Sequence, residues 1–343
     1  MKSGPGGHRA GMSNRPGPAP DDSTDRPDSR VLVVTGASSG IGRATVLEAA
    51  SRGEHLVLAA RGADALAEVA VLCRAAGAAS VLTVPTDVGD DDAVADLVRR
   101  VLDEHGRLDA FVSCAGVVAY GRTEDVPAEI FDGVIRTNLL GSANVARHVV
   151  PVLRRQRCGV LLLVGSVIGH IGVPAMSPYA VSKWGVRSLA RQLGLENRDL
   201  PDVRIEYVAP GGVDTPIYAQ AANYSGYEGR PPPPVSDPRH AARQLLRRLD
   251  GHRLLPLPAQ LTPANDLIRF GFSFLPGVYD RIVGPLFRVA ATNLARPVDD
   301  QAGNVLEPQE DGNELRGDHG SALVGIGQNV LQGLRGRGER GGA

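Results

Sequence analysis

The chain has 343 residues, enough for a full hydrophobic core, and its 37 Lys and Arg nearly balance its 38 Asp and Glu. This near-neutral, interspersed charge argues against a nucleic-acid-binding protein, which needs a net basic face. No apolar run is long enough to span a bilayer, no apolar secretion signal opens the chain, and the three cysteines have neither metal nor redox spacing. We therefore expect a cytoplasmic protein without a metal site or a nucleic-acid partner.

The N-terminal residues 1–29 are rich in Gly, Pro, Ser and Asp and contain almost nothing apolar. Because such a segment cannot bury enough surface to offset the entropy of ordering, we expect a disordered leader. From residue 30 to 260, short apolar runs alternate with segments of helical length. This pattern predicts one doubly wound α/β domain, a parallel sheet with helices on both faces. The six expected strands cover residues 31–34, 55–58, 80–84, 108–112, 160–164 and 203–208.

A glycine-rich loop follows the first expected strand and precedes a helical pattern. Its sequence is Thr35-Gly36-Ala37-Ser38-Ser39-Gly40-Ile41-Gly42. Glycines at this place permit a tight turn and a close approach of the backbone to a pyrophosphate, whose charge the helix N-terminus meets. The loop therefore predicts a dinucleotide-binding site, with a purely structural turn as the alternative.

The end of the second expected strand indicates which dinucleotide is bound. An NAD site usually places a carboxylate there to accept hydrogen bonds from the ribose 2′-hydroxyl, but Ala60 supplies none. Arg61 instead offers a planar guanidinium that can hold a 2′-phosphate with two hydrogen bonds. Ser38 and Arg43 are further candidates for this pocket. For Arg43 the alternative, an ordinary charged residue on the protein surface, has equal weight. The sequence predicts a preference for NADP(H) over NAD(H).

Tyr179 and Lys183 are four residues apart, so they face the same way on a helix. A phenol normally ionises near pH 10, and an ammonium on the next turn is expected to lower its pKa toward neutrality. Such a phenol could give and take a proton at neutral pH. Taken alone, the pair is more often a surface feature. Ser166 closes the fifth expected strand, at the sheet edge where ligands bind.

The loop has the form Thr-Gly-x-x-x-Gly-x-Gly, and together with Tyr-x-x-x-Lys it resembles the classical short-chain dehydrogenase/reductase family. The resemblance implies a Rossmann-like fold and an NADP(H)-dependent oxidoreductase that interconverts a carbonyl and a secondary alcohol by hydride transfer. It also implies that Ser166 and Tyr179 hold the substrate oxygen and that Tyr179 is the general acid/base. Lys183 would lower the pKa of the phenol and hold the nicotinamide ribose. Asn138 would hold a water chain that reprotonates Tyr179.

The same resemblance implies the cofactor contacts. Asp87 and Val88 follow the third strand, where the family contacts adenine. Ser113-Cys114-Ala115-Gly116 stands where the family has Asn-Asn-Ala-Gly, so we expect this turn to be less firmly braced. The full set of implied contacts is Gly36, Ser38, Ser39, Gly40, Ile41, Gly42, Arg61, Asp87, Val88, Ser113, Ala115, Gly116, Tyr179, Lys183, Pro210, Gly211, Val213 and Thr215.

Two further catalytic roles are not supported by the sequence, one for His170 and one for Ser166 as a hydrolase nucleophile. His170 has no partner for a metal or for a nucleophile, so we expect it on a pocket wall or in a loop. Ser166 does not lie in a Gly-x-Ser-x-Gly elbow, which argues against a hydrolase.

The C-terminal third departs from the α/β pattern. Residues 218–234 form a Tyr-, Gly- and Pro-rich loop expected to cover the substrate, and residues 261–296 are expected to form a helical extension. Its aromatic segment 267–275 is expected to close the pocket or core, with a membrane surface or a subunit interface as alternatives. Residues 297–343 are rich in Gly, Asp and Glu and are expected to be a disordered tail.

The expected partner is a small-molecule carbonyl or alcohol, whose identity the sequence does not give. The resemblance implies a homo-oligomer. Peripheral membrane contact through residues 264–292 is the lesser alternative. The rival function is a catalytically silent, dinucleotide-sensing regulatory protein of the same fold. The intact Ser, Tyr, Lys and Asn set argues against that rival, because a sensor needs no proton donor.

Overall fold

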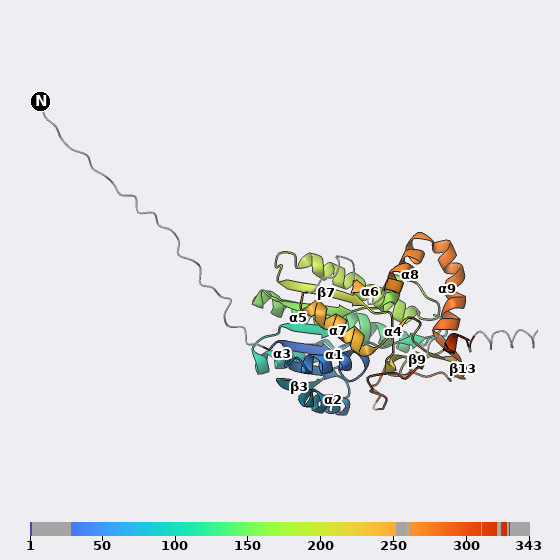
Figure 1. Cartoon of the computed structure of the whole chain (residues 1–343), viewed down its shortest axis with the longest axis horizontal. Coiled ribbons are helices and arrows are strands. Elements are labelled where there is room, and N and C mark those ends of the chain that lie inside the picture. The colour runs from blue at the N-terminus through green and yellow to red at the C-terminus, as the bar shows by residue number, and fades with distance from the viewer. Residues whose placement is uncertain are drawn as a thin grey trace, which may run out of the picture.

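A parallel sheet crosses the centre of the protein, as the computed structural model shows (Figure 1). The structure describes residues 1, 29–251, 259–260, 263–309, 311–320, 324–327 and 329, so most of the expected leader lies outside the described residues. The strand order is β12-β7-β6-β4-β1-β2-β3, and every neighbouring pair is parallel. The strands are β1 (Val31–Thr35), β2 (His55–Ala60), β3 (Ser80–Pro85), β4 (Ala110–Ser113), β6 (Gly159–Val164), β7 (Val203–Ala209) and β12 (Ala259–Gln260).

Helices cover both faces of this sheet, which confirms the doubly wound architecture. Alternate residues of a strand point to opposite faces. Val31 and Val33 accordingly pack in one cluster with α3 (Asp91–His105), α5 (Gly141–Gln156) and α6 (Ser177–Glu196). Leu32 and Val34 pack in another with α1 (Gly40–Ala50), α2 (Ala63–Ala75) and α7 (Pro238–Leu249). Because both faces are buried, the strands read as continuous apolar runs.

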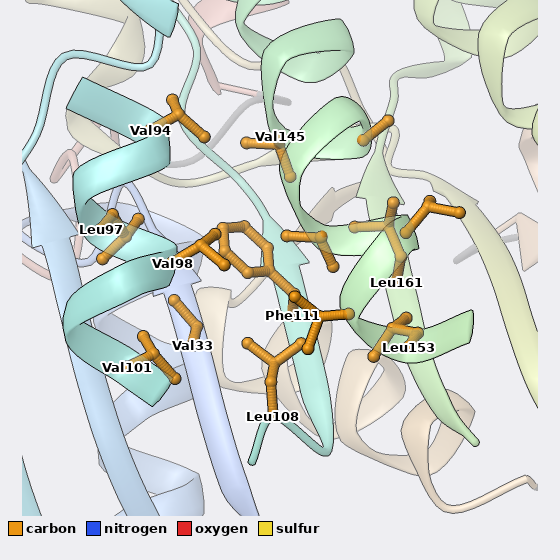
Figure 2. Close-up of a cluster of buried hydrophobic side chains, with 14 of the residues drawn as sticks. Val33, Val94, Leu97, Val98, Val101, Leu108, Phe111, Val145, Leu153 and Leu161 are labelled. Atoms are coloured by element: carbon orange, nitrogen blue, oxygen red, sulfur yellow. The ribbon is translucent and has the colours of Figure 1, made fainter. Parts of the chain in front are cut away.

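Figure 2 shows the centre of the first cluster, where Phe111 of β4 lies between α3 and α5. Val98 of α3 and Leu161 of β6 pack in the same cluster. Local signals fix the ends of α3: the Asp90 carboxylate accepts hydrogen bonds from the amides of Asp92 and Ala93, and the helix ends at Gly106 with φ of 68°. Its apolar stripe is thereby held over the sheet.

The strand order places a switch point between β1 and β4. The chain runs outward from β1 through β2 to β3 and then crosses back to β4 on the other side of β1. The loops after these two strands therefore diverge and leave a crevice at the carboxyl edge of the sheet, the usual ligand position in such folds. The glycine-rich loop follows β1 at this edge.

Two helices form the C-terminal extension, α8 (Pro263–Phe274) and α9 (Pro276–Ala290), which confirms the expected helical segment. Figure 1 shows them as an adjacent pair at one end of the molecule, with β13 (Thr292–Pro297) close to the end of α9. The Tyr279 hydroxyl of α9 donates to the Gly172 carbonyl at 2.8 Å, and Phe272 of α8 packs edge-on against Trp184 of α6. Among the described residues no helix is both long and apolar enough to cross a membrane.

The loop between β7 and α7 is held by short strand pairs. β5 (Ala119–Tyr120) pairs with β9 (Ala222–Asn223), β8 (Gly212–Val213) with β11 (Val235–Ser236), and β10 (Tyr227–Gly229) with β13. A further helix, α4 (Ala128–Ile135), leads through a π-helical turn, Arg136–Leu140, into α5.

The segment after residue 297 differs from the expected disordered tail where the structure describes it. Val305 is buried and packs with Ile130 and Val134 of α4, and the Asn304 amide donates to the Gln220 carbonyl at 2.9 Å. Few apolar side chains suffice here because polar side chains of the domain, such as Arg61 and Gln220, donate hydrogen bonds to the carbonyls of this segment. We call residues 304–309 and 311–319 the C-terminal strap.

Candidate active site

Ser166, Tyr179 and Lys183 meet at the carboxyl edge of the sheet. Ser166 follows β6, and its hydroxyl accepts a hydrogen bond from the Ile168 amide at 3.2 Å, which caps a short 3-10 turn. Proline in the first turn of α6 favours helix initiation, so Tyr179 lies in that turn and Lys183 one turn later. All three side chains are buried, and they line one cavity. The Ser166 hydroxyl acts to lower the pKa of the Tyr179 phenol.

Lys183 points into the protein. Its Nζ donates to the Val164 carbonyl at 3.1 Å and lies 5.7 Å from the centre of the Tyr179 ring. Burial lowers the pKa of this ammonium to about 8, although the thiol of Cys114 acts in the opposite direction. Lys183 therefore stays charged at neutral pH and loses its charge under mildly alkaline conditions.

The prediction that the pKa of Tyr179 is lowered toward neutrality is wrong for the folded chain alone. Burial raises the pKa of this phenol to about 12, and the Ser166 hydroxyl only partly offsets that rise. The physical reason is desolvation: a phenolate taken out of water loses more than the nearby hydroxyl returns. Tyr179 is consequently a protonated phenol at neutral pH, a proton donor rather than a preformed base.

Asn138 is fully buried in the π-helical turn and braces two parts of the site. Its Oδ1 accepts from the Val117 amide, and its Nδ2 donates to the Val117 carbonyl and to the Ser182 hydroxyl, each at 2.9 Å. A Cβ added at Gly116 would lie 3.3 Å from Asn138 Oδ1 and 3.6 Å from Lys183 Nζ. Asn138 thus fixes the loop after β4 against α6, close to Lys183, and its side chain lines neither cavity of the dinucleotide crevice.

The glycine-rich loop is built for close backbone contact. Gly36 has φ of 69°, and a Cβ there would lie 2.9 Å from Ala115 Cα. A Cβ at Gly42 would lie 2.1 Å from the Gly36 carbonyl oxygen. Larger residues at these two positions would therefore push the loop apart.

Thr35 is a bracing residue that the sequence reasoning missed. Its hydroxyl accepts from the amides of Cys114 and Ala115 at 3.1 and 3.2 Å, joining the ends of β1 and β4. The turn in which Ser113 and Cys114 replace two asparagines is thus held from the neighbouring strand.

Two small cavities, of about 140 and 100 Å³, bring most of the predicted cofactor residues together. Ser113 is buried at the end of β4 and lines neither. The first cavity takes in Gly36, Ser39, Gly40, Ile41, Gly42, Gly116, Tyr179, Lys183, Pro210, Gly211, Val213 and Thr215. The second takes in Gly36, Ser38, Ser39, Arg61, Asp87, Val88, Ala115 and Gly116.

These groups fit a dinucleotide. The N-terminus of α1 and the glycine loop lie between Tyr179 and Lys183 on one side and Arg61 on the other, which suits a pyrophosphate flanked by two nucleoside halves. Arg61 Nη2 donates to the Asn304 carbonyl at 2.5 Å and Nη1 to that of Val305 at 3.3 Å. Burial lowers the pKa of Arg61 and Asp87 counteracts this, but an arginine stays charged in proteins.

Arg43 and His170 have structural surroundings. Arg43 Nη2 pairs with Glu68 at 2.7 Å and Nη1 donates to the Asn313 carbonyl of the strap at 2.5 Å. His170 is buried against Tyr207, its ring nitrogens have no hydrogen-bond partner, and burial lowers its pKa to about 3. It is a neutral side chain outside the cavities of the site. Within the described part of the chain no three potential ligands gather around a metal position.

A third, larger cavity of about 530 Å³ also begins at Ser166 and Tyr179. The helices α8 and α9 form much of its wall, through residues such as Ile268, Leu275 and Val283. The segment 267–275 therefore helps to close a pocket beside the candidate catalytic residues. This was the preferred interpretation of that segment from its sequence.

Known proteins share both the sequence pattern and the fold. A family model described as short chain dehydrogenase matches residues 30–224. The sepiapterin reductase of Chlorobaculum tepidum is 34% identical over 197 residues, covering 55% of this chain and 80% of the relative. The 3-ketodihydrosphingosine reductase of Bos taurus is 27% identical over 278 residues, covering 76% of this chain and 81% of the relative.

A solved structure agrees with these sequence matches. The alcohol dehydrogenase from the archaeon Thermococcus sibiricus, complexed with 5-hydroxy-NADP, superposes with a TM-score of 0.57 at 29% identity, covering 68% of this chain and 94% of that one. The range that the family model matches contains the glycine loop, Ser166, Tyr179, Lys183 and the strands from β1 to β7. The chain therefore belongs to the short-chain dehydrogenase/reductase family.

Proposed function

We propose that this protein is an NADP(H)-dependent oxidoreductase that interconverts a ketone or aldehyde and the corresponding alcohol, with Tyr179 as the general acid/base. The observation that carries the proposal is the burial of Tyr179, Ser166 and Lys183 around one cavity that continues to the glycine loop. The relatives support the coarser statement, an oxidoreductase of carbonyl and alcohol groups.

The residues of the chain divide the chemistry between them. The nicotinamide, when bound, supplies or accepts the hydride. The hydroxyls of Ser166 and Tyr179 donate hydrogen bonds to the carbonyl oxygen, and Tyr179 releases its proton as negative charge grows there. Because burial raises the pKa of Tyr179 to about 12, the phenol enters carbonyl reduction already protonated. The Lys183 ammonium then stabilises the phenolate that remains, and alcohol oxidation reverses these steps.

A screen of substrates tests this function against the rival sensor. NADPH consumption is measured over ketones, aldehydes, steroids, quinones and acyl thioesters, and NADPH binding is measured on the same sample by fluorescence. We expect turnover of at least one class. Tight binding of NADPH without turnover of any member of the panel would favour the silent sensor.

The preference for NADP(H) is proposed from Arg61 and from the absence of a carboxylate at Ala60. Replacing Arg61 by alanine is expected to raise the KM for NADPH by roughly 10- to 100-fold, because a charge-assisted hydrogen-bonded pair contributes about 1.5–3 kcal/mol. The KM for NADH, which lacks the 2′-phosphate, should change little. Initial rates with both cofactors measure the effect. Arg61→Lys is the matched variant, because it keeps the positive charge and loses the paired N–H donors of the guanidinium. A wild-type rate with NADH that equals the NADPH rate would contradict the proposal.

A further inference from the structure

The cavity of about 530 Å³ beside Ser166 and Tyr179 indicates a class of substrate. Its volume lies within the range of roughly 300–1,000 Å³ typical of small-molecule sites. Its inner wall comes from the turn after β6, where Val167 and Ile171 pack against Tyr279 of α9. Its outer wall comes from α8 and α9, including the half-exposed Ile282. The turn after β6 and the consecutive helices α8 and α9, which lie far from that turn in sequence, thus enclose a space lined mainly by apolar side chains.

The charged side chain of the described lining is already hydrogen-bonded by the protein. Among the described residues that line this cavity, Arg230 carries the charged side chain, and it is buried. Its Nε donates to the Ala290 carbonyl at 3.3 Å and its Nη2 to the Val289 carbonyl at 3.1 Å. These carbonyls end α9, where the helix dipole is negative, so the guanidinium compensates the helix end. The cavity therefore favours a neutral occupant over a charged one.

The polar groups that remain lie at the catalytic end. The Ser166 and Tyr179 hydroxyls line both this cavity and the one at the glycine loop, so a carbonyl oxygen at their hydroxyls would have its carbon beside the dinucleotide site. The body of the substrate would then extend away from the cofactor, along α8 and α9. Burial of that body contributes about 25 cal/mol for each Å² of apolar surface.

We infer that the substrate is an uncharged ketone, or the matching secondary alcohol, with a large apolar body that lies between the turn after β6 and the helices α8 and α9. The inference rests on the proposed oxidoreductase function and adds the substrate class to it.

Methyl ketones of increasing length, from butanone to dodecanone, test the inference with wild-type protein and NADPH. The value of kcat/KM is expected to rise about two- to fourfold for each added methylene until the cavity is filled. A ketone as long as dodecanone that ends in a carboxylate should be at least tenfold poorer, because its charge would enter an apolar space. A flat or falling series overturns the inference.

Calorimetric binding of the same ketones separates this inference from the proposed function. Dodecanone that binds more tightly than butanone but is not reduced supports the pocket and contradicts the oxidoreductase. Reduction of butanone and dodecanone with equal kcat/KM and equal affinity supports the oxidoreductase and overturns the substrate class.

Variants of α9 and α8 localise the effect. Val283→Trp adds volume to the α9 wall of the cavity, and Ile282→Glu places a charge in its outer wall at a position the fold leaves half exposed. Each is expected to lower kcat/KM for dodecanone at least tenfold while that for butanone stays within twofold. Phe274→Ala is the matched control, since Phe274 is exposed on α8 and does not line the cavity. Equal losses for both ketones, or a loss in the control, would overturn the assignment.

The C-terminal strap carries a second inference from different contacts. The Gly40 amide, at the N-terminus of α1, donates to the Glu314 carbonyl at 2.9 Å. Arg61 gives its two terminal nitrogens to the Asn304 and Val305 carbonyls. The strap therefore uses the two groups suited to the pyrophosphate and the 2′-phosphate of a dinucleotide.

The strap also divides the crevice. Gln220 and Asn304 line both small cavities, of about 140 and 100 Å³, and Gln220 Nε2 is held by the Gly312 carbonyl of the strap at 3.1 Å. Each cavity is smaller than the roughly 300–1,000 Å³ of ordinary ligand sites. We propose that the strap competes with the dinucleotide for Gly40 and Arg61, and that it is displaced when the cofactor binds.

A glycine next to the strap provides the test. Gly303 has φ of 55°, and a Cβ there would lie 2.4 Å from the Gln220 carbonyl oxygen. Gly303→Ala is therefore expected to loosen the strap and lower the Kd for NADPH at least fivefold in a fluorescence titration. Gly320→Ala, also at positive φ but with no atom within 4 Å of the added Cβ, should leave the Kd unchanged. An unchanged or higher Kd in Gly303→Ala would overturn the competition.

Hydrogen exchange gives a readout that does not depend on a variant. In wild-type protein, NADPH is expected to increase exchange of the Asn304 and His319 amides while protecting the glycine loop, because displacement of the strap breaks their hydrogen bonds to the Gln220 carbonyl and the Asp214 carboxylate. Protection of both segments would show instead that the strap closes over the cofactor, and it would reject competition.

Discussion

Tyr179→Phe is expected to reduce kcat for carbonyl reduction by roughly 10²- to 10⁴-fold, the usual contribution of a positioned general acid. The change removes one oxygen, so it leaves the ring packed with Val118 and Met176 in its buried cluster. The Ser166 hydroxyl remains to hold the substrate oxygen, but the phenol proton of Tyr179 is no longer there to be transferred. Steady-state NADPH oxidation measures kcat, and a fluorescence titration should show a Kd for NADPH within about twofold of the wild type.

Tyr207→Phe is the matched control for this loss. Tyr207 is partly buried next to the turn at Ser166, and its buried hydroxyl has no side-chain partner, yet it lies outside the cavities of the site. Its removal should leave kcat within a factor of two. If Tyr179→Phe kept a tenth or more of the wild-type rate, Tyr179 would not be the proton donor.

Lys183→Met is expected to reduce kcat/KM by roughly 10²- to 10³-fold, the scale seen when one preorganised electrostatic group is removed. Methionine fills a similar volume, so packing along α6 is preserved while the charge beside Tyr179 is lost. The phenolate left after proton transfer would then stand in a buried site without a cation. A thermal melt of the variant separates this effect from unfolding, and activity close to the wild type would remove Lys183 from the mechanism.

The pH profile gives the same residue a signature of its own. Because burial lowers the pKa of Lys183 to about 8, the ammonium is charged below that pH and becomes neutral as the pH rises through it. Tyr179, with its pKa raised to about 12, stays protonated over the same range. For carbonyl reduction, kcat/KM is therefore expected to be level below about pH 8 and to fall above it. Lys183→Met should lack that fall.

The high pKa of Tyr179 changes how the Tyr-x-x-x-Lys pair is understood in this protein. The spacing correctly places the amine one turn from the phenol, but spacing carries no information on how much water reaches the pair. In the folded chain both groups are buried. Desolvation favours the neutral form of each group, so it raises the pKa of Tyr179 and lowers the pKa of Lys183. The cation consequently acts mainly on the phenolate that reduction creates.

Some parts of the site were readable because their signals are local. The glycine loop is one of them, since a Cβ at Gly42 would lie 2.1 Å from the carbonyl oxygen of Gly36, only six residues earlier in the chain. Ser166 ends an apolar run, and the helix that carries Tyr179 begins with a proline turn. The brace from Thr35 to Cys114 was not readable, because it joins β1 to β4 across 79 residues of chain.

By itself, the sequence determined the parallel sheet, the carboxyl edge at which the glycine loop and Ser166 lie, and the relative placement of Tyr179 and Lys183. These follow from apolar periodicity and from spacing within single elements. Only the tertiary structure decided that α8 and α9 enclose an apolar cavity, that residues after 297 lie across the dinucleotide crevice, and that Tyr179 is held protonated. Each of these depends on burial. Burial is set by contacts between segments that are far apart in the chain, and such contacts produce no periodic pattern in the sequence.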